Sequence, residues 1–132
     1  MFTYIDLIGV PYQDGGRDEK GMDCWGLARE LFRRQGYTLP LYPIDPRDPK
    51  KVDATAHRVL SAWWKLSVPT VGCLVLLKLS TGLWANHVGI YIGSGRFIHA
   101  YSGAGVCIDR LRRWQSRIAG YYMPGGRNGT DN

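Results

Sequence analysis

A cysteine and two histidines in this sequence have the types and contexts that a nucleophilic enzyme site requires. Cys24 lies in the segment GMDCWGLARELF, residues 21–32, where apolar residues recur at the spacing of one helix face. Asp23 is a good N-cap, which places the thiol in the first helical turn, where the positive end of the helix dipole favours a thiolate. A thiolate is the nucleophilic form of cysteine, so Cys24 is the candidate nucleophile and its pKa is expected to be lowered.

Such a nucleophile also needs a base and a residue that orients the base, and the sequence holds three histidines. His57 lies on a basic helical segment and is expected to face solvent. His87 begins the strand-like segment HVGIYI, and His99 lies in the next one, FIHAY. Two histidines in adjacent strands, together with a helix-capping cysteine, favour catalysis over a structural role. Cys73 and Cys107 lie inside apolar segments, so both are expected to be inert core thiols.

The loop between the two histidine strands decides whether the two side chains meet. A two-residue loop, Ser94–Gly95, would place His87 and His99 on opposite faces of the sheet. A three-residue loop that also includes Gly93 makes them diagonal neighbours on one face, within hydrogen-bonding reach. Glycine suits the left-handed position that such a loop requires. We therefore predict the three-residue loop, with the pairs Ile92–Arg96 and Gly89–His99.

Along the chain, the helices are expected to come before the strands of the sheet. Residues 3–9 have the pattern of a short helix, and the Cys24 helix is expected to end near Gly36. After a proline-rich extended segment, Asp48 is expected to cap a further helix that reaches about residue 65.

Five segments rich in β-branched or aromatic residues follow from residue 70, namely VGCLVLLKL, NHVGIYI, RFIHAY, GVCIDRL and AGYYM. Helices first and strands second indicate an α+β domain with a five-stranded, mainly antiparallel sheet. The chain has 132 residues, enough for one core, so a single domain is predicted over residues 1–124. The polar tail, residues 125–132, is expected to be disordered.

The composition narrows the choice of partners. No apolar run approaches the roughly 20 residues that span a bilayer, so no membrane partner is expected. The N-terminus lacks the basic region of a signal peptide, so synthesis in the cytoplasm without such a peptide is expected. The three cysteines show no CxxC spacing, and no HExxH motif occurs. Neither a disulfide framework nor a metal or other cofactor is therefore expected.

The formal charge is +6, and basic residues gather in the segment RLRRWQSR, residues 110–117. Basic patches attract phosphate, but no helix-turn-helix, zinc-finger or RRM signature accompanies them. A nucleic-acid partner is therefore not expected. A solvated face, or attraction to an anionic polymer such as cell wall, is the favoured interpretation.

Three motifs also carry a family resemblance. In this order and spacing, GVPYQDGG, GMDCWGL and HVGIYIGSGRFIHA resemble the NlpC/P60 family of papain-like cell-wall cysteine peptidases. The likeness extends over about residues 3–123, almost the whole chain. The DCWGL form and the proline-rich insertion after the helix are most similar to the tail-associated members that bacteriophages encode.

The resemblance implies a papain-like α+β fold, with the helices packed on the sheet, and hydrolysis of peptide bonds in peptidoglycan stem peptides. The implied bond joins D-glutamate, through its side chain, to a diamino acid. Cys24 matches the nucleophile, His87 the general base and His99 the residue that orients His87. Tyr12 matches a tyrosine near the oxyanion, and the backbone N–H of Cys24 is the other natural donor there. A bacteriophage tail role, in local cell-wall degradation or in tail assembly, implies tail-tip proteins as partners and the virion tail as a location.

Two positions depart from the family pattern. Trp25 stands where the family often has serine, and it either packs over the substrate cleft or shields the start of the helix. Cys73 stands where the family commonly has aspartate in the first strand. This second change affects local strand contacts but leaves the three catalytic positions intact.

Two alternative functions stay open. A catalytically silent tail component would keep the fold as a binding module, although intact Cys24, His87 and His99 argue against it. A cysteine amidase or acyltransferase with another substrate is the second, because a triad determines the reaction type better than the substrate. The sequence lacks the long apolar surface helix that a lipid-directed enzyme would need.

Overall fold

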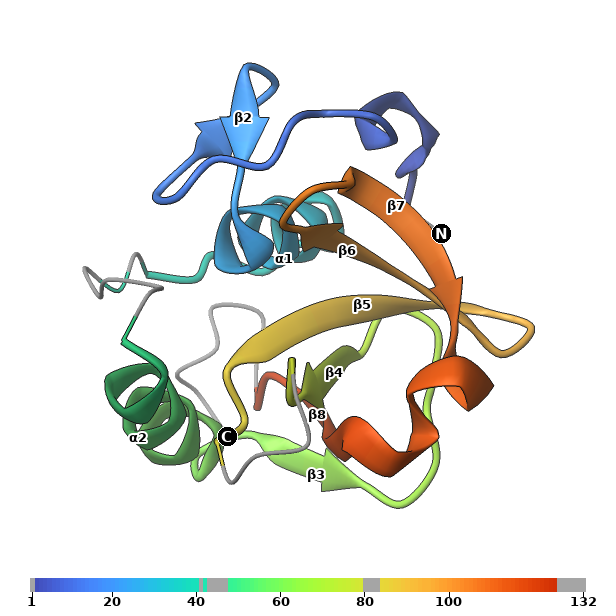
Figure 1. The fold of residues 1–132 in the computed structure, drawn as a ribbon. Helices are drawn as coiled ribbons and strands as arrows, with labels where there is room; N and C mark the ends of the chain where they lie inside the picture. The colour runs from blue at the N-terminus through green and yellow to red at the C-terminus, as the bar shows by residue number, and fades with distance from the viewer. Residues whose placement is uncertain (1, 41, 43–47, 80–83, 126–132) are drawn as a thin grey trace.

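The computed structural model describes residues 2–40, 42, 48–79 and 84–125 (Figure 1). Helices and a mainly antiparallel sheet give the α+β class that the sequence predicts. Apart from Gly125, the tail that is predicted to be disordered lies outside the described residues. Among the described helices, none has the length and apolar character of a membrane span.

The helices are shorter than the sequence predicts. Helix α2 gives way at its C-terminus to a short edge strand, so it does not reach residue 65. The segment predicted as a short helix at 3–9 contains a single 3₁₀ turn. The bounds are Ile5–Leu7 for η1, Cys24–Arg34 for α1, Pro49–Leu60 for α2 and Leu111–Arg117 for η2.

Helix α1 begins where the sequence places its cap. The Asp23 carboxylate accepts a hydrogen bond from the backbone N–H of Gly26 at 2.7 Å, which satisfies one free donor of the first turn. Gly36, with a φ of 95°, follows the helix at its C-terminus. The fully buried apolar face of the helix consists of Leu27, Ala28, Leu31 and Phe32. Burial of this stripe sets the rotation of the helix and therefore the place of Cys24.

The main sheet has six strands in the order β3-β8-β4-β5-β6-β7, and all neighbouring strands are antiparallel. The strands are β3 (Trp64–Leu66), β4 (Leu74–Leu77), β5 (His87–Gly93), β6 (Arg96–Tyr101), β7 (Gly105–Arg110) and β8 (Ile118–Met123). A small ribbon of β1 (Arg17–Asp18) and β2 (Gly21–Met22) precedes α1. All five predicted segments form strands. The sixth, β3, is too short for an alternating pattern to reveal it.

Different elements cover the two faces of the sheet (Figure 1). Helix α1 lies on one face, where Ile90 and Ile98 belong to the main core. On the opposite face a smaller core contains Phe97 together with Trp114 from η2. His99 alternates with Ile98 along β6, so its side chain shares the face of Phe97.

The β5–β6 hairpin has the predicted register. Ile90 pairs with Ile98, and in this register Gly89 faces His99. A Cβ atom added to Gly89 would lie 3.1 Å from the Cβ of His99, which shows how closely the two residues approach. The competing pair, Ile90 with His99, does not form. His87 and His99 therefore lie on the same face of the sheet, as predicted.

The turn of this hairpin differs from the prediction. Gly93, not Ile92, pairs with Arg96, so the turn itself contains only Ser94–Gly95. Both turn residues have a positive φ, as a two-residue type I′ turn requires. The extra residue is accommodated by a bulge in β5 between Tyr91 and Gly93. The bulge, and not a longer loop, supplies the shift that brings the histidines to one face.

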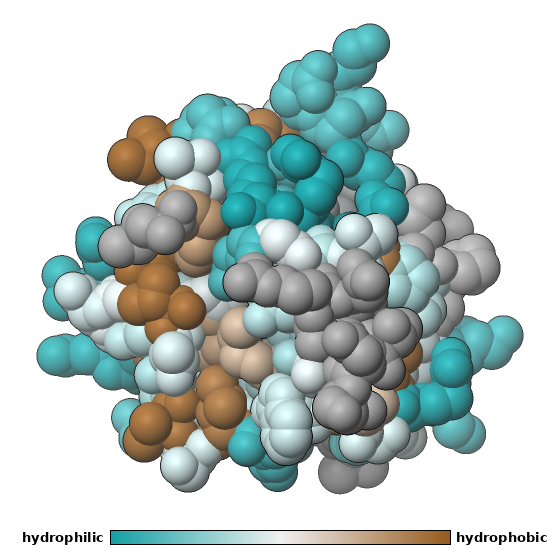
Figure 2. Space-filling view, turned by 180° about the vertical axis from the view of Figure 1, so that it is seen from behind, coloured by the Kyte–Doolittle hydropathy of each residue, from teal (hydrophilic) through white to brown (hydrophobic). Residues whose placement is uncertain are grey.

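The exposed hydrophobic side chains are dispersed. Figure 2 shows several hydrophobic residues on the back of the molecule, interspersed with residues of intermediate hydropathy and with hydrophilic ones. The large exposed hydrophobic residues of the described chain are Ile5, Ile8, Trp64, Val68, Val71, Leu79 and Trp84. Scattered exposure of this kind is normal for a folded domain.

Candidate active site

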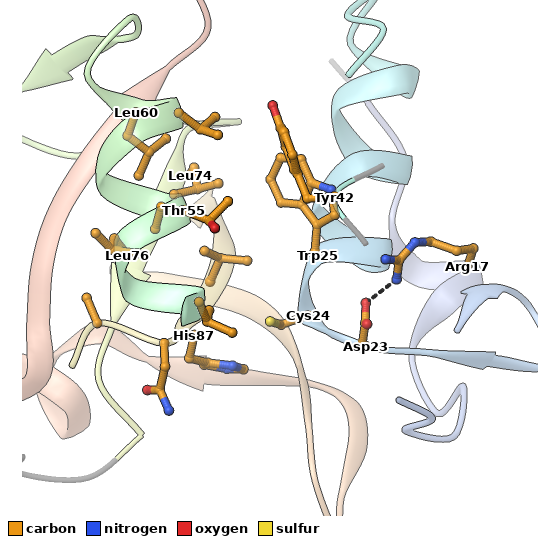
Figure 3. Close-up of a pocket in the computed structure, with 16 residues that line it drawn as sticks. Arg17, Asp23, Cys24, Trp25, Tyr42, Thr55, Leu60, Leu74, Leu76 and His87 are labelled. Atoms are coloured by element: carbon orange, nitrogen blue, oxygen red, sulfur yellow. Dashed lines mark hydrogen bonds and ion pairs between the residues drawn. The ribbon is translucent and has the colours of Figure 1, made fainter. Parts of the chain in front are cut away.

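Cys24 lies at the edge of a pocket between α1 and α2 (Figure 3). His87 lines the same pocket, and Figure 3 shows the sulfur of Cys24 pointing to the side where the His87 ring lies. The rest of the wall is mostly apolar, with Trp25, Tyr42, Ala56, Leu60, Leu74 and Leu76 among its residues. The fold thus brings the predicted nucleophile and the predicted base, 63 positions apart in the sequence, into one pocket.

Three donors hold the residue that precedes the nucleophile. Asp23 Oδ1 accepts a hydrogen bond from the Gly26 N–H and another from Nη1 of Arg17 at 2.6 Å. Its other oxygen accepts from the backbone N–H of Gly15 at 3.0 Å. The Asp23 side chain is only 7% exposed, so its charge is compensated by these donors and not by water. The first turn of α1, and with it Cys24, is therefore rigidly placed.

The two histidines of the sheet are in direct contact. His87 is 3% exposed and His99 is 0% exposed. Nε2 of His87 lies 2.7 Å from Nδ1 of His99, and the ring centroids are 5.0 Å apart. This is a short hydrogen bond between the rings. The predicted bond is therefore present, and it holds the His87 ring in one orientation.

An acidic residue that the sequence analysis did not single out extends this pair. Asp109 Oδ2 lies 3.2 Å from Nε2 of His99, the nitrogen that is not bonded to His87. Strand β7 pairs with β6 so that His99 stands opposite Cys107, and Asp109, two residues further, shares that face. Asp109 is the only acidic residue of the segment GVCIDRL. Strand alternation could have placed it beside His99 once the register of the second hairpin was known.

The protonation states differ from the sequence-based prediction. Burial raises the pKa of Cys24 to about 11, and hydrogen bonds from the backbone of Val88 and Trp25 offset only part of this rise. Burial, followed by the proximity of His99, lowers the pKa of His87 to about 3. The predicted lowered pKa of Cys24 is therefore wrong, because desolvation of the thiolate outweighs the field of the helix terminus. Near neutral pH the site holds a neutral thiol beside a neutral imidazole.

Trp25 and Tyr12 have different relations to the pocket. The Trp25 indole lines it, donates its N–H to the carbonyl of Pro40 at 3.1 Å, and packs on Tyr42 with a centroid distance of 5.4 Å. Trp25 therefore forms part of the cleft wall. The Tyr12 hydroxyl donates to Asp14 at 2.8 Å, and Tyr12 does not belong to the lining. Its hydroxyl would have to leave Asp14 to reach an oxyanion.

The other cysteines and the third histidine lie outside this pocket. Cys73 is fully buried, as predicted, but Cys107 is partly exposed because β7 is the edge strand of the sheet. Burial raises the pKa of both thiols, as it does for Cys24, but neither of them lines the pocket beside His87. The His57 side chain is 66% exposed, and its Nδ1 lies 2.8 Å from the carbonyl of Asp53. It faces solvent, as predicted.

One cluster in the described chain has metal-ligand types close together. Ligand atoms of His99, Cys107 and Asp109 lie within 4.8 Å of one another. A metal ion would need the bare Nε2 of His99 and the thiolate of Cys107. Nε2 is already hydrogen-bonded to Asp109, and burial raises the thiol pKa. The geometry therefore fits a hydrogen-bonded row better than a metal site.

The sequence matches known proteins over most of its length. The model of the NlpC/P60 family matches residues 9–123. The chain is 33% identical over 120 residues to the murein DD-endopeptidase MepS/murein LD-carboxypeptidase of Escherichia coli K12. This alignment covers 89% of the present chain and 57% of that protein. It is 30% identical over 95 residues to the γ-D-glutamyl-L-lysine dipeptidyl-peptidase of Bacillus subtilis, covering 71% of this chain and 28% of that protein. The chain thus spans little more than half of the first relative.

Solved structures share the fold. The NlpC/P60 domain of the peptidoglycan hydrolase SagA has a TM-score of 0.62 and 22% identity, with 90% of this chain and 91% of that one covered. An NlpC/P60 family protein of Bacillus cereus has a TM-score of 0.64 and 22% identity, with 93% and 41% covered. These likenesses confirm the papain-like fold that the resemblance implies. With the family match over residues 9–123, they lead to one conclusion: this chain belongs to the NlpC/P60 family.

Proposed function

We propose that this chain is a cysteine peptidase that hydrolyses peptide bonds in peptidoglycan stem peptides. The observation that carries the proposal is the 2.7 Å contact between His87 Nε2 and His99 Nδ1, because His87 lines the same pocket as Cys24. A nucleophile, a base and an orienting residue are the parts that acyl transfer requires. The names of the relatives, a murein endopeptidase and a γ-D-glutamyl-L-lysine peptidase, support the substrate class.

The neutral thiol and imidazole make His87 a general base. It takes the proton from the Cys24 thiol while the sulfur attacks the carbonyl carbon of the scissile bond. The imidazolium then gives this proton to the leaving amine, the C–N bond breaks, and a thioester remains on Cys24. A water molecule, deprotonated by His87, attacks the thioester, releases the carboxylic acid and restores the thiol.

The start of α1 supplies a donor for the oxyanion that forms during attack. A helix leaves the N–H groups of its first turn without intrahelical acceptors, and they carry the positive end of the dipole. The Asp23 side chain already occupies the N–H of Gly26. The backbone N–H of Cys24, next to the attacking sulfur, is therefore the natural donor, and its action needs no rearrangement of the helix.

Within this substrate class, the proposed scissile bond joins D-glutamate, through its side chain, to a diamino acid. The name of the Bacillus subtilis relative describes a bond of this type. A glutamate linked through its side chain keeps a free α-carboxylate close to the scissile bond. Arg17 also lines the pocket, and Nη1 of its guanidinium donates to Asp23 and to the carbonyl of Gly16. Its remaining N–H groups are suited to bind such a carboxylate.

The proposed setting is a bacteriophage tail, where the protein would open the cell wall locally or act in assembly with tail-tip proteins. The support for this setting is the resemblance to tail-associated members that the sequence analysis assigns to the DCWGL motif around Cys24 and to the proline-rich segment after α1. Mass spectrometry of purified virions tests it. The chain is expected among the tail proteins, and a virion fraction that lacks it would contradict a location in the mature tail.

The activity is tested with purified muropeptides of known sequence. Wild-type protein should release fragments whose masses identify cleavage between D-glutamate and the diamino acid, and Cys24→Ala should release none. Cleavage at another stem-peptide bond would retain the peptidase and correct the bond. If wild type and Cys24→Ala give identical muropeptide spectra, the protein is not a peptidase of this wall, and a silent tail component becomes the better description.

A further inference from the structure

A buried row of side chains runs from the pocket to Asp109 at the edge of the sheet, and its outer end has no part in the mechanism above. We propose that Asp109 is a positioning residue of the same site, whose carboxylate selects the ring tautomers that leave Nδ1 of His87 free to act as the base. This role rests on the proposed function, because it serves the same acyl transfer.

The Asp109 carboxylate is held in a defined orientation. Its Oδ2 lies 3.2 Å from Nε2 of His99 and accepts a hydrogen bond from the Trp114 indole N–H, also at 3.2 Å. Its Oδ1 lies 3.5 Å from Nη1 of Arg113, whose side chain is 72% exposed. Trp114 is 5% exposed, and its ring stacks against the ring of His87 with the centroids 6.2 Å apart. One carboxylate oxygen is therefore turned inward to the histidines, and the other is turned to solvent.

The hydrogen-bonding chemistry of the row permits one arrangement of protons. An ionised carboxylate only accepts, so Nε2 of His99 must carry the hydrogen that it donates to Asp109. Neutral His99 then has a bare Nδ1, which accepts from Nε2–H of His87 across 2.7 Å. Neutral His87 consequently has a bare Nδ1. That nitrogen is the one that can take a proton from the Cys24 thiol.

Without Asp109 the opposite arrangement becomes available. His99 could then carry its hydrogen on Nδ1 and donate it to Nε2 of His87. His87 would hold its own hydrogen on Nδ1 and could not accept one from Cys24. Both arrangements contain the same short bond between the rings, so only the group beyond His99 distinguishes them.

The charge of Asp109 has a second effect during the reaction. When His87 takes the thiol proton, a positive charge appears on a ring that is 3% exposed. Water cannot solvate this charge well, and the Asp109 carboxylate is the anion at the end of the same hydrogen-bonded row. Burial lowers the pKa of His99, and Asp109 acts against this by favouring its charged form. The carboxylate itself is not protonated in this scheme.

The first test is spectroscopic and requires no substrate. In ¹⁵N-labelled wild-type protein at pH 7, NMR should show His99 with hydrogen on Nε2 and His87 with hydrogen on Nε2. Asp109→Asn replaces the carboxylate with a group of the same shape that can also donate, so His99 should lose its single tautomer. Asp6→Asn is the matched control, because Asp6 is also an ion-paired surface carboxylate, bonded to Arg34 at 2.7 Å.

The second test measures thiol reactivity, also without substrate. Iodoacetamide should alkylate Cys24 of Asp109→Asn about ten- to a hundredfold more slowly than wild type at pH 7. Asp6→Asn should react at the wild-type rate. Trp114→Phe removes the indole N–H that holds Oδ2 but keeps an aromatic ring, so it should give an intermediate rate. It also keeps the proposal testable if Asp109→Asn does not fold.

The outcomes separate this inference from the proposed function. A wild-type His99 that carries hydrogen on Nδ1, or unchanged tautomers and alkylation rates in Asp109→Asn, would overturn the role of Asp109. If both tests give the expected change but wild type leaves muropeptides intact, Asp109 still positions the histidines and only the substrate is wrong. If wild type cleaves muropeptides, Asp109→Asn should lower kcat by about ten- to a hundredfold with KM unchanged.

Discussion

Gly89 is the residue whose substitution links the packing of the sheet most directly to the chemistry of the site. It lies in β5 opposite His99, and an added Cβ would approach Cδ2 of Phe97 at 2.7 Å and the carbonyl oxygen of Ile98 at 2.9 Å. The same Cβ would lie 3.1 Å from the Cβ of His99. Two of these three neighbours are backbone or Cβ atoms, which cannot rotate away. Gly89→Ala must therefore push β5 and β6 apart at the two histidines.

The magnitude of this perturbation follows from general values for overpacked sites. Extra atoms in a tightly packed core cost about 1–3 kcal/mol. For a domain of this size, each kcal/mol lowers Tm by roughly 3–6 °C, so Gly89→Ala should melt about 3–18 °C below wild type. A displacement of His99 by a few tenths of an ångström stretches its bond to His87. Misplacement on this scale should lower kcat by roughly ten- to a hundredfold.

Calorimetry and muropeptide kinetics on the same preparations measure both effects, and Gly103→Ala is the matched control. Gly103 has a φ of 89° with open space around its Cβ position, so alanine there introduces backbone strain without a clash. That strain costs about 1–2 kcal/mol and should lower Tm without lowering kcat. A Gly89→Ala protein with wild-type kcat, or a Gly103→Ala protein that loses as much activity, would refute this reasoning.

Three further predictions concern the residues of the site. His87→Ala should lower kcat by about 10²- to 10⁴-fold and His99→Ala by less, because the second loses orientation and not the base; equal losses in steady-state assays would contradict these roles. Cys24→Ala should abolish cleavage with an unchanged Tm, whereas Cys73→Ala should keep activity and lower the free energy of unfolding by about 1 kcal/mol, as activity assays and denaturant titrations would show. The pKa of His87, about 3, lies below its ordinary value of 6.5, so between these pH values the unfolded state binds more protons than the folded state. The free energy of unfolding should therefore fall as the pH drops from 6.5 toward 3. Denaturant titrations at several pH values should show a smaller pH dependence of this free energy in His87→Gln.

Much of this site follows from local features of the sequence. The apolar stripe of α1, the cap at Asp23 and the glycine at its end place Cys24 in a first helical turn without any knowledge of its neighbours. The alternation of two strands around a Gly-Ser-Gly segment predicts that His87 and His99 share one face, although a bulge in β5, and not the predicted three-residue loop, brings this about. These features can be predicted from the sequence because a helix cap, a helical period and a strand period depend on residues only a few positions apart. The family motifs are composed of the same residues.

The remaining features depend on contacts between distant segments. Asp109 reaches His99 only because β7 pairs with β6 in one particular register, and Trp114 then holds the carboxylate from a helix that no strand pattern predicts. The direction in which the pKa of Cys24 shifts likewise depends on how much water the sheet and α2 exclude from the thiol. A helix terminus is visible in the sequence, but the desolvation that opposes its field is a property of everything packed around it. The sequence therefore supplies the chemical groups of the site, and the packed fold determines their protonation and their partners.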